Sequence, residues 1–238
     1  MLMNAILSRD VSTWIVFLLS IPIILFSLSF HEASHAFIAH KLGDDTARNM
    51  GRMTLNPFSH IHPFGFLSML LIGIGWAKPV PIAAGNFKNP RKGMMLSSLA
   101  GPVSNLILGI IFVILSSAAL IPYNLSAVAD SEPDMVWVIL YEFFFVGGYL
   151  NFSLFLFNLI PIPPFDGSRI FFYFLPKDWY FKVMKYERYI GLGLLVLILF
   201  LEYFFDFSPV AFLAQGLFNL VSSPFNKLAA TIFQAIQG

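Results

Sequence analysis

Two histidines and a glutamate stand in the segment HEASH, which closes a long apolar run near the start of the chain. His31 and His35 are four residues apart, so in a helix they lie on one face, about 6 Å apart along the axis. This spacing lets two imidazoles reach one Zn²⁺ ion, while Glu32 lies beside the metal as a base. The alternative is a set of polar residues that face neighbouring helices. An unpaired acid at membrane depth costs about 2.5–3.5 kcal/mol, which favours the metal site.

A catalytic zinc site takes a third protein ligand and leaves the fourth position to water. Asp166 is the candidate, because it follows the third long apolar segment in NLIPIPPFDGSRI. Pro161, Pro163 and Pro164 interrupt the helix there, and unwound backbone at this depth is tolerated only against protein or a water-filled cavity. A loop aspartate that caps a following helix is the alternative. We predict ligation, because the two-histidine motif requires a partner at its own depth.

Further polar side chains stand on other segments that should lie close to this site in space. Asn105 and Asn158 carry amides on spans that should flank the site, so either one could orient substrate or stabilise an oxyanion. Hydrogen bonding between helices, which is common for asparagine in membranes, is the alternative for both. His60 and His62 are either reserve or gating ligands or polar turn residues, and we favour the turn interpretation.

The composition places these residues in a membrane protein. Of the 238 residues, 58% are hydrophobic and only 11% are charged, whereas soluble domains carry about 25% charged residues. The net charge of +1 comes without a basic stripe, which argues against a nucleic-acid partner. Cysteine is absent, so disulfides and thiolate metal sites are excluded.

The apolar segments predict several spans. A bilayer core of about 30 Å needs about 20 helical residues. The stretch Phe64–Ala77 is too short at 14 residues, so it predicts a re-entrant or interfacial loop. The tail Pro209–Ile236, which contains Pro224 and Lys227, is either a further span or an interfacial helix. The segments that meet the length requirement are Ser12–His40, Met94–Ile121, Met135–Ile160 and Tyr189–Phe205.

Charge predicts the orientation of these spans. The connection Lys41–Lys92 holds seven lysines and arginines, and Pro161–Arg188 holds five. The connection Pro122–Asp134 holds none, and it carries three acidic residues. Because positive charge stays in the cytoplasm, the first and third connections are expected to be cytoplasmic. Both parts of the predicted zinc site therefore lie toward the cytoplasmic face.

Five motifs in their order along the chain resemble the site-2 protease family of intramembrane zinc metalloproteases. They are HEASH, GRMTLNPFSHIHPFG, GWAKPVPI, GPVSN and NLIPIPPFDG, and the resemblance covers about Ser29 to Ile170. It implies a core of three spans, with zinc held within the membrane by two histidines and an aspartate. It also implies peptide-bond hydrolysis within or beside a substrate's transmembrane helix. Phe165 replaces a common leucine and His62 an expected aspartate, and neither is a presumed ligand.

We therefore predict an all-α, polytopic integral membrane protein with about four to six transmembrane helices. A re-entrant loop and a small β element are expected after the first span. The β element is a short strand at Gly51–Pro57, whose edge would bind an extended substrate. Residues 1–238 are expected to form a single transmembrane metalloprotease domain, with a catalytic core at about 12–175 and C-terminal helices at about 186–238. This arrangement is similar to a minimal family member without a PDZ-like or CBS-like domain.

The predicted function is an intramembrane zinc endopeptidase that cleaves transmembrane protein substrates in the lipid bilayer of a prokaryotic cell, as in regulated intramembrane proteolysis. A proteolytically inactive zinc-binding membrane adaptor or a transporter is the alternative. The intact Glu32 argues against an inactive protein, and the few acids in the spans argue against a transporter. The predicted zinc ligands are His31, His35 and Asp166, and the predicted catalytic residues are Glu32, Asn105 and Asn158.

Overall fold

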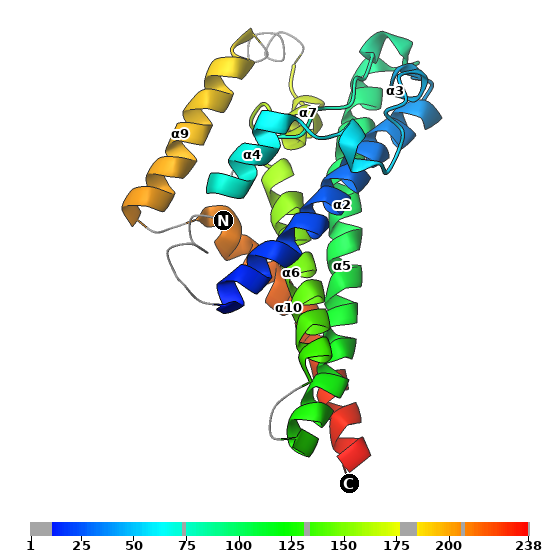
Figure 1. Cartoon of the computed structure of the whole chain (residues 1–238). Coiled ribbons are helices and arrows are strands. Elements are labelled where there is room, and N and C mark those ends of the chain that lie inside the picture. Colours follow the sequence, from blue (N-terminus) through cyan, green and yellow to red (C-terminus); the bar gives the residue numbers. More distant parts are fainter. Residues whose placement is uncertain (1–10, 73–74, 131–133, 177–184, 206–207, 238) are drawn as a thin grey trace.

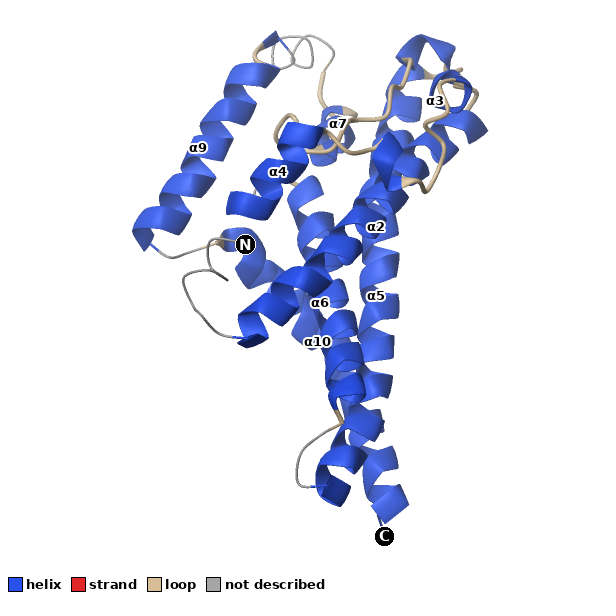
Figure 2. Ribbon diagram, viewed as in Figure 1, coloured by secondary structure: helices blue, strands red, loops and turns tan. Residues whose placement is uncertain are grey.

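The computed structural model describes residues 11–72, 75–130, 134–176, 185–205 and 208–237. In this part of the chain the regular secondary structure is helical, and Figure 2 shows helices joined by loops. The predicted all-α architecture is confirmed for these residues.

Three helices are long and apolar enough to cross a membrane. They are α2 (Val11–Lys41), α5 (Pro90–Asp130) and α6 (Met135–Asn158), and they confirm the first three predicted spans to within a few residues at most ends. Lipid offers no partner for backbone N–H and C=O groups, so long apolar runs of this kind form helices. At 1.5 Å per residue, α5 is roughly 60 Å long and reaches beyond a bilayer core of about 30 Å.

Two further helices follow the three-span core. α9 (Glu187–Phe205) corresponds to the fourth predicted span, and it stands to one side of the bundle in Figure 1. α10 (Pro209–Gln237) corresponds to the tail and packs against both α5 and α6. Ala214 and Phe218 of α10 join Val113 of α5 and Phe152 of α6 in a buried apolar cluster. The tail is therefore part of the helical bundle.

The connection after α2 begins with a helix stop at glycine. Gly43 takes a φ of 105°, a conformation that residues with a Cβ rarely adopt. The N–H of Asp44 then donates to the carbonyl of Ala39 across this turn, which is the usual way in which a helix ends at a left-handed glycine. The short helix α3 (Thr46–Asn49) follows and ends before Gly51, whose φ is 67°.

The predicted re-entrant segment folds back on itself. The 3-10 turn η1 (Pro57–Ser59) leads into α4 (Pro63–Ile72), a helix of ten residues. Ile61 before α4 and Ala77 after it form an antiparallel bridge, so the chain returns to the point at which it left. This arrangement agrees with a loop that enters the membrane and leaves it on the same side.

The expected strand at Gly51–Pro57 is not found, because these described residues form turns and irregular backbone. Arg52, a residue of the expected strand, is buried, and its guanidinium donates to the carbonyls of Lys78 and Pro79. Thr54 accepts from the His60 ring through its carbonyl oxygen. A side-chain hydrogen bond therefore occupies the Thr54 carbonyl, and Arg52 holds this segment against the loop that carries Lys78 and Pro79.

The first and third connections meet at one end of the bundle. Figure 1 shows α3, α4 and α7 (Asp166–Phe172) at the same end of the long helices. Arg91 of α5 donates to the carbonyls of Phe172, Tyr173 and Leu175, which ties the end of α7 to the start of α5. Among the charges behind the predicted orientation, Glu132, Lys177 and Lys182 lie outside the described residues.

Candidate metal centre

His31 and His35 lie on one face of the last turns of α2. Their rings are 4.6 Å apart between centroids, and their Nε2 atoms are 3.0 Å apart. Both residues are buried, with 5% and 6% of their surface exposed. The spacing of four residues in a helix therefore brings two imidazole nitrogens to one point, as the HEASH motif predicts.

Asp166 reaches the same point from the other end of the sequence. Its Oδ2 atom lies 3.2 Å from the Nε2 atom of His31 and 3.2 Å from that of His35. Asp166 is the first residue of α7, and the residue before it, Phe165, makes no side-chain cap. The alternative of an aspartate that caps a helix does not describe this side chain, because its carboxylate faces the histidines.

Hydrogen bonds on the far side of each ring set the direction of the two imidazoles. Nδ1–H of His35 donates to the carbonyl oxygen of Ser97 at 2.7 Å. Nδ1 of His31 lies 2.6 Å from the amide oxygen of Asn105. Because both partners are acceptors, each Nδ1 carries a proton, and in the neutral imidazole each Nε2 then turns a lone pair toward Asp166. This is the tautomer that a metal-binding histidine needs.

The three facing atoms fit a zinc ion. Two ligands of a tetrahedral Zn²⁺, each about 2.0–2.1 Å from the metal, lie about 3.3–3.4 Å apart. The two Nε2 atoms and the Asp166 oxygen are 3.0–3.2 Å from one another. The three residues therefore each offer a ligand atom within 4.8 Å of the other two. Three lone pairs that face one another repel unless a cation lies between them. The donor set of two imidazoles and one carboxylate matches catalytic zinc sites.

Gly101 of α5 lies directly against both rings. A Cβ atom at this position would come within 2.4 Å of His35 Nε2 and 2.5 Å of His31 Cε1. Only glycine leaves room for the imidazoles here, which explains the first residue of the GPVSN motif in physical terms. The backbone of α5 is therefore one wall of the metal centre.

Glu32 is buried beside the histidines and lies outside the group of potential ligands. Its Oε2 atom accepts a hydrogen bond of 2.9 Å from the backbone N–H of Val80, and 8% of its surface is exposed. This position agrees with a side chain that lies beside the metal without binding it.

The two predicted catalytic asparagines take different positions. Both ends of the buried Asn105 amide are used, because its oxygen faces His31 and its nitrogen donates to Asn151. Asn158 donates to the carbonyl of Leu154 within its own helix. The structure thus places Asn105 behind a histidine ring. Among the described interactions, Asn158 makes no contact with the three potential ligands.

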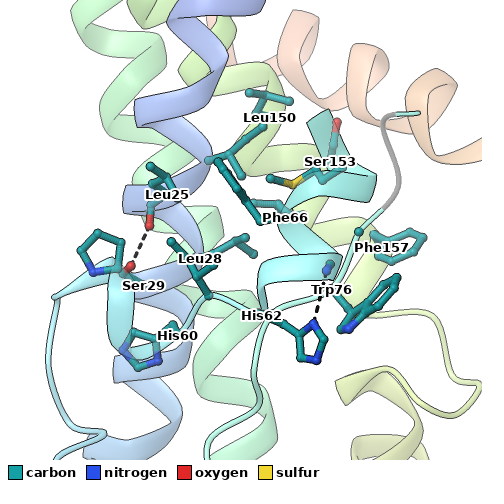
Figure 3. Close-up of a pocket in the computed structure, with 18 of the residues that line it drawn as sticks. Leu25, Leu28, Ser29, His60, His62, Phe66, Trp76, Leu150, Ser153 and Phe157 are labelled. Atoms are coloured by element: carbon teal, nitrogen blue, oxygen red, sulfur yellow. Dashed lines mark hydrogen bonds between the residues drawn. The ribbon is translucent and has the colours of Figure 1, made fainter. Parts of the chain in front are cut away.

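His60 and His62 lie outside the metal group, in agreement with the turn interpretation. The Nε2–H group of His60 donates to the carbonyl of Thr54 at 2.8 Å. The ring of His62 lies 5.6 Å from that of Trp76 between centroids. Figure 3 shows both histidines at the edge of a cavity.

This cavity, of about 240 Å³, opens between α2, α4 and α6 and is mostly apolar. Leu28 of α2 lines it one turn before His31, while Phe66 of α4 and Phe157 of α6 line other walls (Figure 3). The cavity therefore reaches the turn of α2 that precedes His31, although none of the three potential ligands lines it.

Several residues at this centre were not predicted from the sequence. The Ser97 carbonyl and Gly101 precede Asn105 at intervals of four residues, a helical spacing that could have indicated one shared face of α5. Asn151 is an amide within an apolar span, and such groups need a buried partner. Val80 carries no comparable signal, because its contact with Glu32 depends on a long loop.

The sequence profile of peptidase family M50 matches residues 19–199. The chain belongs to peptidase family M50. This is the site-2 protease family that the motifs resemble, and the match covers α5, α6 and most of α2. The M50 chain is therefore a zinc metalloprotease, and zinc is its metal.

Named relatives agree with the M50 family. The chain is 38% identical over 218 residues to the Bacillus subtilis (strain 168) protein YwhC, over 90% of this chain and 91% of the relative. It is 30% identical over 161 residues to Rip2 of Mycolicibacterium smegmatis, over 64% of this chain and 55% of the relative. Both are named as candidate zinc metalloproteases. The zinc metalloprotease MJ0392 of Methanocaldococcus jannaschii is 28% identical over 181 residues, 75% of this chain and 41% of the relative. No solved structure matches the chain significantly.

Proposed function

We propose that this M50 protein is an intramembrane zinc endopeptidase that cleaves peptide bonds in or near the transmembrane segments of other membrane proteins. His31, His35 and Asp166 are the zinc ligands, and Glu32 is the general base. The convergence of the three ligand atoms at the ends of long apolar helices carries the proposal. A site built there acts on chains that are themselves in the membrane.

The mechanism follows from the positions of these side chains. When bound, the zinc ion supplies Lewis acidity, which polarises a scissile carbonyl and makes a nearby water more acidic. Glu32 takes the proton of the attacking water and later delivers it to the leaving amine. The Val80 N–H holds one carboxylate oxygen of Glu32 in place, which leaves the other oxygen for the proton.

Depth and orientation follow from charge. We infer that the metal centre lies near the cytoplasmic face of a prokaryotic cell membrane, because the flanking connections are rich in lysine and arginine. The reported relatives come from bacteria and an archaeon, which supports a prokaryotic membrane. We propose that α9 and α10 also cross the membrane, in addition to α2, α5 and α6. The protein would then have five spans, within the predicted range of four to six.

The substrate class follows from the surroundings of the centre. The apolar cavity that reaches Leu28 and Ser29, just before His31 on α2, would accommodate the side chains of a membrane-spanning segment better than those of a soluble peptide. No described feature favours the alternative of an inactive adaptor or a transporter, and the buried Glu32 next to the ligands supports catalysis.

The test is a cleavage assay with the purified chain and a single-span test protein in the same lipid vesicles. We expect cleavage that stops on addition of a zinc chelator and returns with added Zn²⁺. Mass spectrometry of the products should place the cut within or beside the apolar span of the test protein. Zinc binding without cleavage of any membrane-spanning test protein would favour the inactive adaptor instead.

A further inference from the structure

A chain of buried amides runs from α6 through α5 to the first histidine of the metal centre. Asn151 lies in the middle of α6 and Asn105 in α5, and neither exposes any surface. Asn151 contacts Asn105, and Asn105 contacts His31. This series of amides ends at Nδ1 of His31, on the edge of the ring that points away from Asp166. The amides therefore support the metal centre without being part of the ligand group.

The orientation of the Asn151 amide is fixed at its outer end. Its Nδ2 atom lies 2.9 Å from the backbone carbonyl oxygen of Gly147 and 2.9 Å from the Ser27 hydroxyl. A carbonyl oxygen can only accept, so the atom that faces it must be the amide nitrogen. The amide oxygen of Asn151 is therefore turned toward Asn105.

The same logic fixes the amide of Asn105. Its Nδ2 atom donates to the oxygen of Asn151 at 3.0 Å. Its oxygen is then the atom that lies 2.6 Å from Nδ1 of His31. An oxygen at that distance requires the proton on Nδ1, so the lone pair of His31 is held on Nε2, the atom nearest to Asp166.

Reversal of either amide would be unfavourable. A flipped Asn151 would point its oxygen at the Gly147 carbonyl and its nitrogen at the nitrogen of Asn105. A flipped Asn105 would point its NH₂ group at the His31 proton and bring two donors together. Each error leaves buried polar atoms without a hydrogen-bond partner, which is unfavourable in a site that water does not reach. Neutral amides also pass on the orientation without a buried charge in the membrane.

We propose that Asn151 is a positioning residue for the metal centre: it orients Asn105 and thereby holds His31 in the tautomer that binds metal through Nε2. The inference rests on the proposed ligation of zinc by His31. Asn151 touches neither the metal nor the substrate, and it acts through Asn105.

The test measures zinc affinity by chelator competition on the purified full chain in lipid nanodiscs. Outer partners of a metal-binding histidine contribute about 10–100-fold to metal affinity, so Asn151→Leu and Asn105→Leu should each weaken zinc binding by about that factor. Asn226→Leu is the control, because Asn226, an exposed residue of α10, also accepts a hydrogen bond from α5, from Ser117, away from the centre. It should leave zinc affinity unchanged.

A double variant separates orientation from packing. Asn105→Asp offers His31 an acceptor whichever way its side chain is turned, so it should retain zinc affinity better than Asn105→Leu. In that background, Asn151→Leu should cost much less zinc affinity than it does in the native protein. The inference is wrong if Asn151→Leu binds zinc as tightly as Asn226→Leu does. It is also wrong if Asn151→Leu reduces zinc affinity by the same factor in the native protein and in Asn105→Asp. Asn151 would then act by packing alone.

Two further measurements keep the outcome interpretable. Thermal unfolding shows whether Asn151→Leu is folded. If it is not, the comparison of Asn105→Asp with Asn105→Leu decides alone. Equal zinc affinities in these two variants would refute the role of the buried amides in orienting His31. His31→Ala tests the underlying ligation separately. Full zinc affinity in His31→Ala would overturn the proposed zinc site, whereas loss of zinc there with an unaffected Asn151→Leu would overturn only the role of Asn151.

Discussion

The backbone N–H of Val80 donates to the carboxylate of Glu32 at 2.9 Å, although 48 residues separate the two in the chain. Val80 stands between Pro79 and Pro81, which have no N–H, so it is the one donor of this short stretch. Arg52 holds the stretch through the carbonyls of Lys78 and Pro79. The loop after α4 thus fixes the orientation of the proposed base.

We expect Glu32→Gln to abolish cleavage and to retain zinc. Glutamine keeps an oxygen that can accept from the Val80 N–H, but it cannot take a proton from water at neutral pH. The measurement pairs the rate of cleavage with the zinc content of the purified variant. Parallel loss of zinc and activity would show that Glu32 is a ligand and not the base.

Asp166→Ala should lose zinc affinity by a large factor, at least about 100-fold, because two imidazoles alone bind zinc much more weakly than three ligands. Asp45→Ala is the control, since the carboxylate of Asp45 is half exposed and pairs with His40 and Arg48. Chelator competition measures both variants. Native affinity in Asp166→Ala would remove this residue from the ligand set.

Gly101→Ala should also impair zinc binding, although it adds only a methyl group. The new Cβ would stand 2.4 Å from His35 Nε2, so the ring or the helix must shift. A comparable loss of about 10–100-fold in zinc affinity is expected from disturbed ligand orientation. Gly216→Ala in α10 is the matched control, because no atom lies within 4 Å of its added Cβ. Equal affinities in the two variants would contradict the close packing of α5 on the histidines.

Acid should weaken the attachment of the loop that carries Val80, because Asp44 binds this loop through its carboxylate. Burial of Asp44 favours a raised pKa, but hydrogen bonds from Thr46, Asn86 and the Ala83 N–H outweigh it and hold the pKa below its usual value. A carboxyl with a lowered folded-state pKa contributes stability that is present above about pH 4 and is lost as the pH falls through the lower value.

The expected loss on Asp44→Asn is about 1–3 kcal/mol at neutral pH, the cost of unmade buried hydrogen bonds. The difference from the native protein should shrink below about pH 4, when Asp44 itself becomes protonated. Thermal unfolding in detergent at several pH values measures it, with Asp45→Asn as an exposed control. A difference that does not change with pH would contradict the assigned ionisation of Asp44.

The orientation in the membrane is open to a labelling experiment, since the chain contains no cysteine. Cysteines at Asn49, in α3, and at Val128, near the end of α5, lie at opposite ends of the bundle, and Val128 is 66% exposed. We expect a membrane-impermeant thiol reagent added outside intact cells to label Val128→Cys but not Asn49→Cys. The reverse pattern would overturn the predicted cytoplasmic position of the metal centre.

The sequence predicts the long helices and the common face of the two histidines well, because both depend on local patterns. An apolar run of sufficient length has few alternatives to a helix in lipid, and histidines four residues apart must share a helix face. Asp166 was predicted by a longer argument, since charge alternation placed the third connection on the side of His31 and His35.

What the sequence did not predict depends on how distant segments pack. The pattern at Gly51–Pro57 has the alternation of a strand, but buried Arg52 instead binds the loop after α4. Asn105 was expected near substrate, yet the rotation of α5 places it between His31 and Asn151. No periodicity in one segment encodes the register of its contact with another, so these interactions required the structure.

The order of the metal-centre residues along the chain has a consequence for biogenesis. Translation proceeds from the N-terminus, so α2 with both histidines and α5 with their supporting groups leave the ribosome before residue 166 is made. At that stage the nascent chain offers two of the three proposed ligands and lacks Asn151. The centre is completed only after α6 has been synthesised. The ribosome and the insertion machinery therefore handle a precursor that lacks one of the three proposed ligands, and the proposed zinc site is complete only once the third long helix is in place.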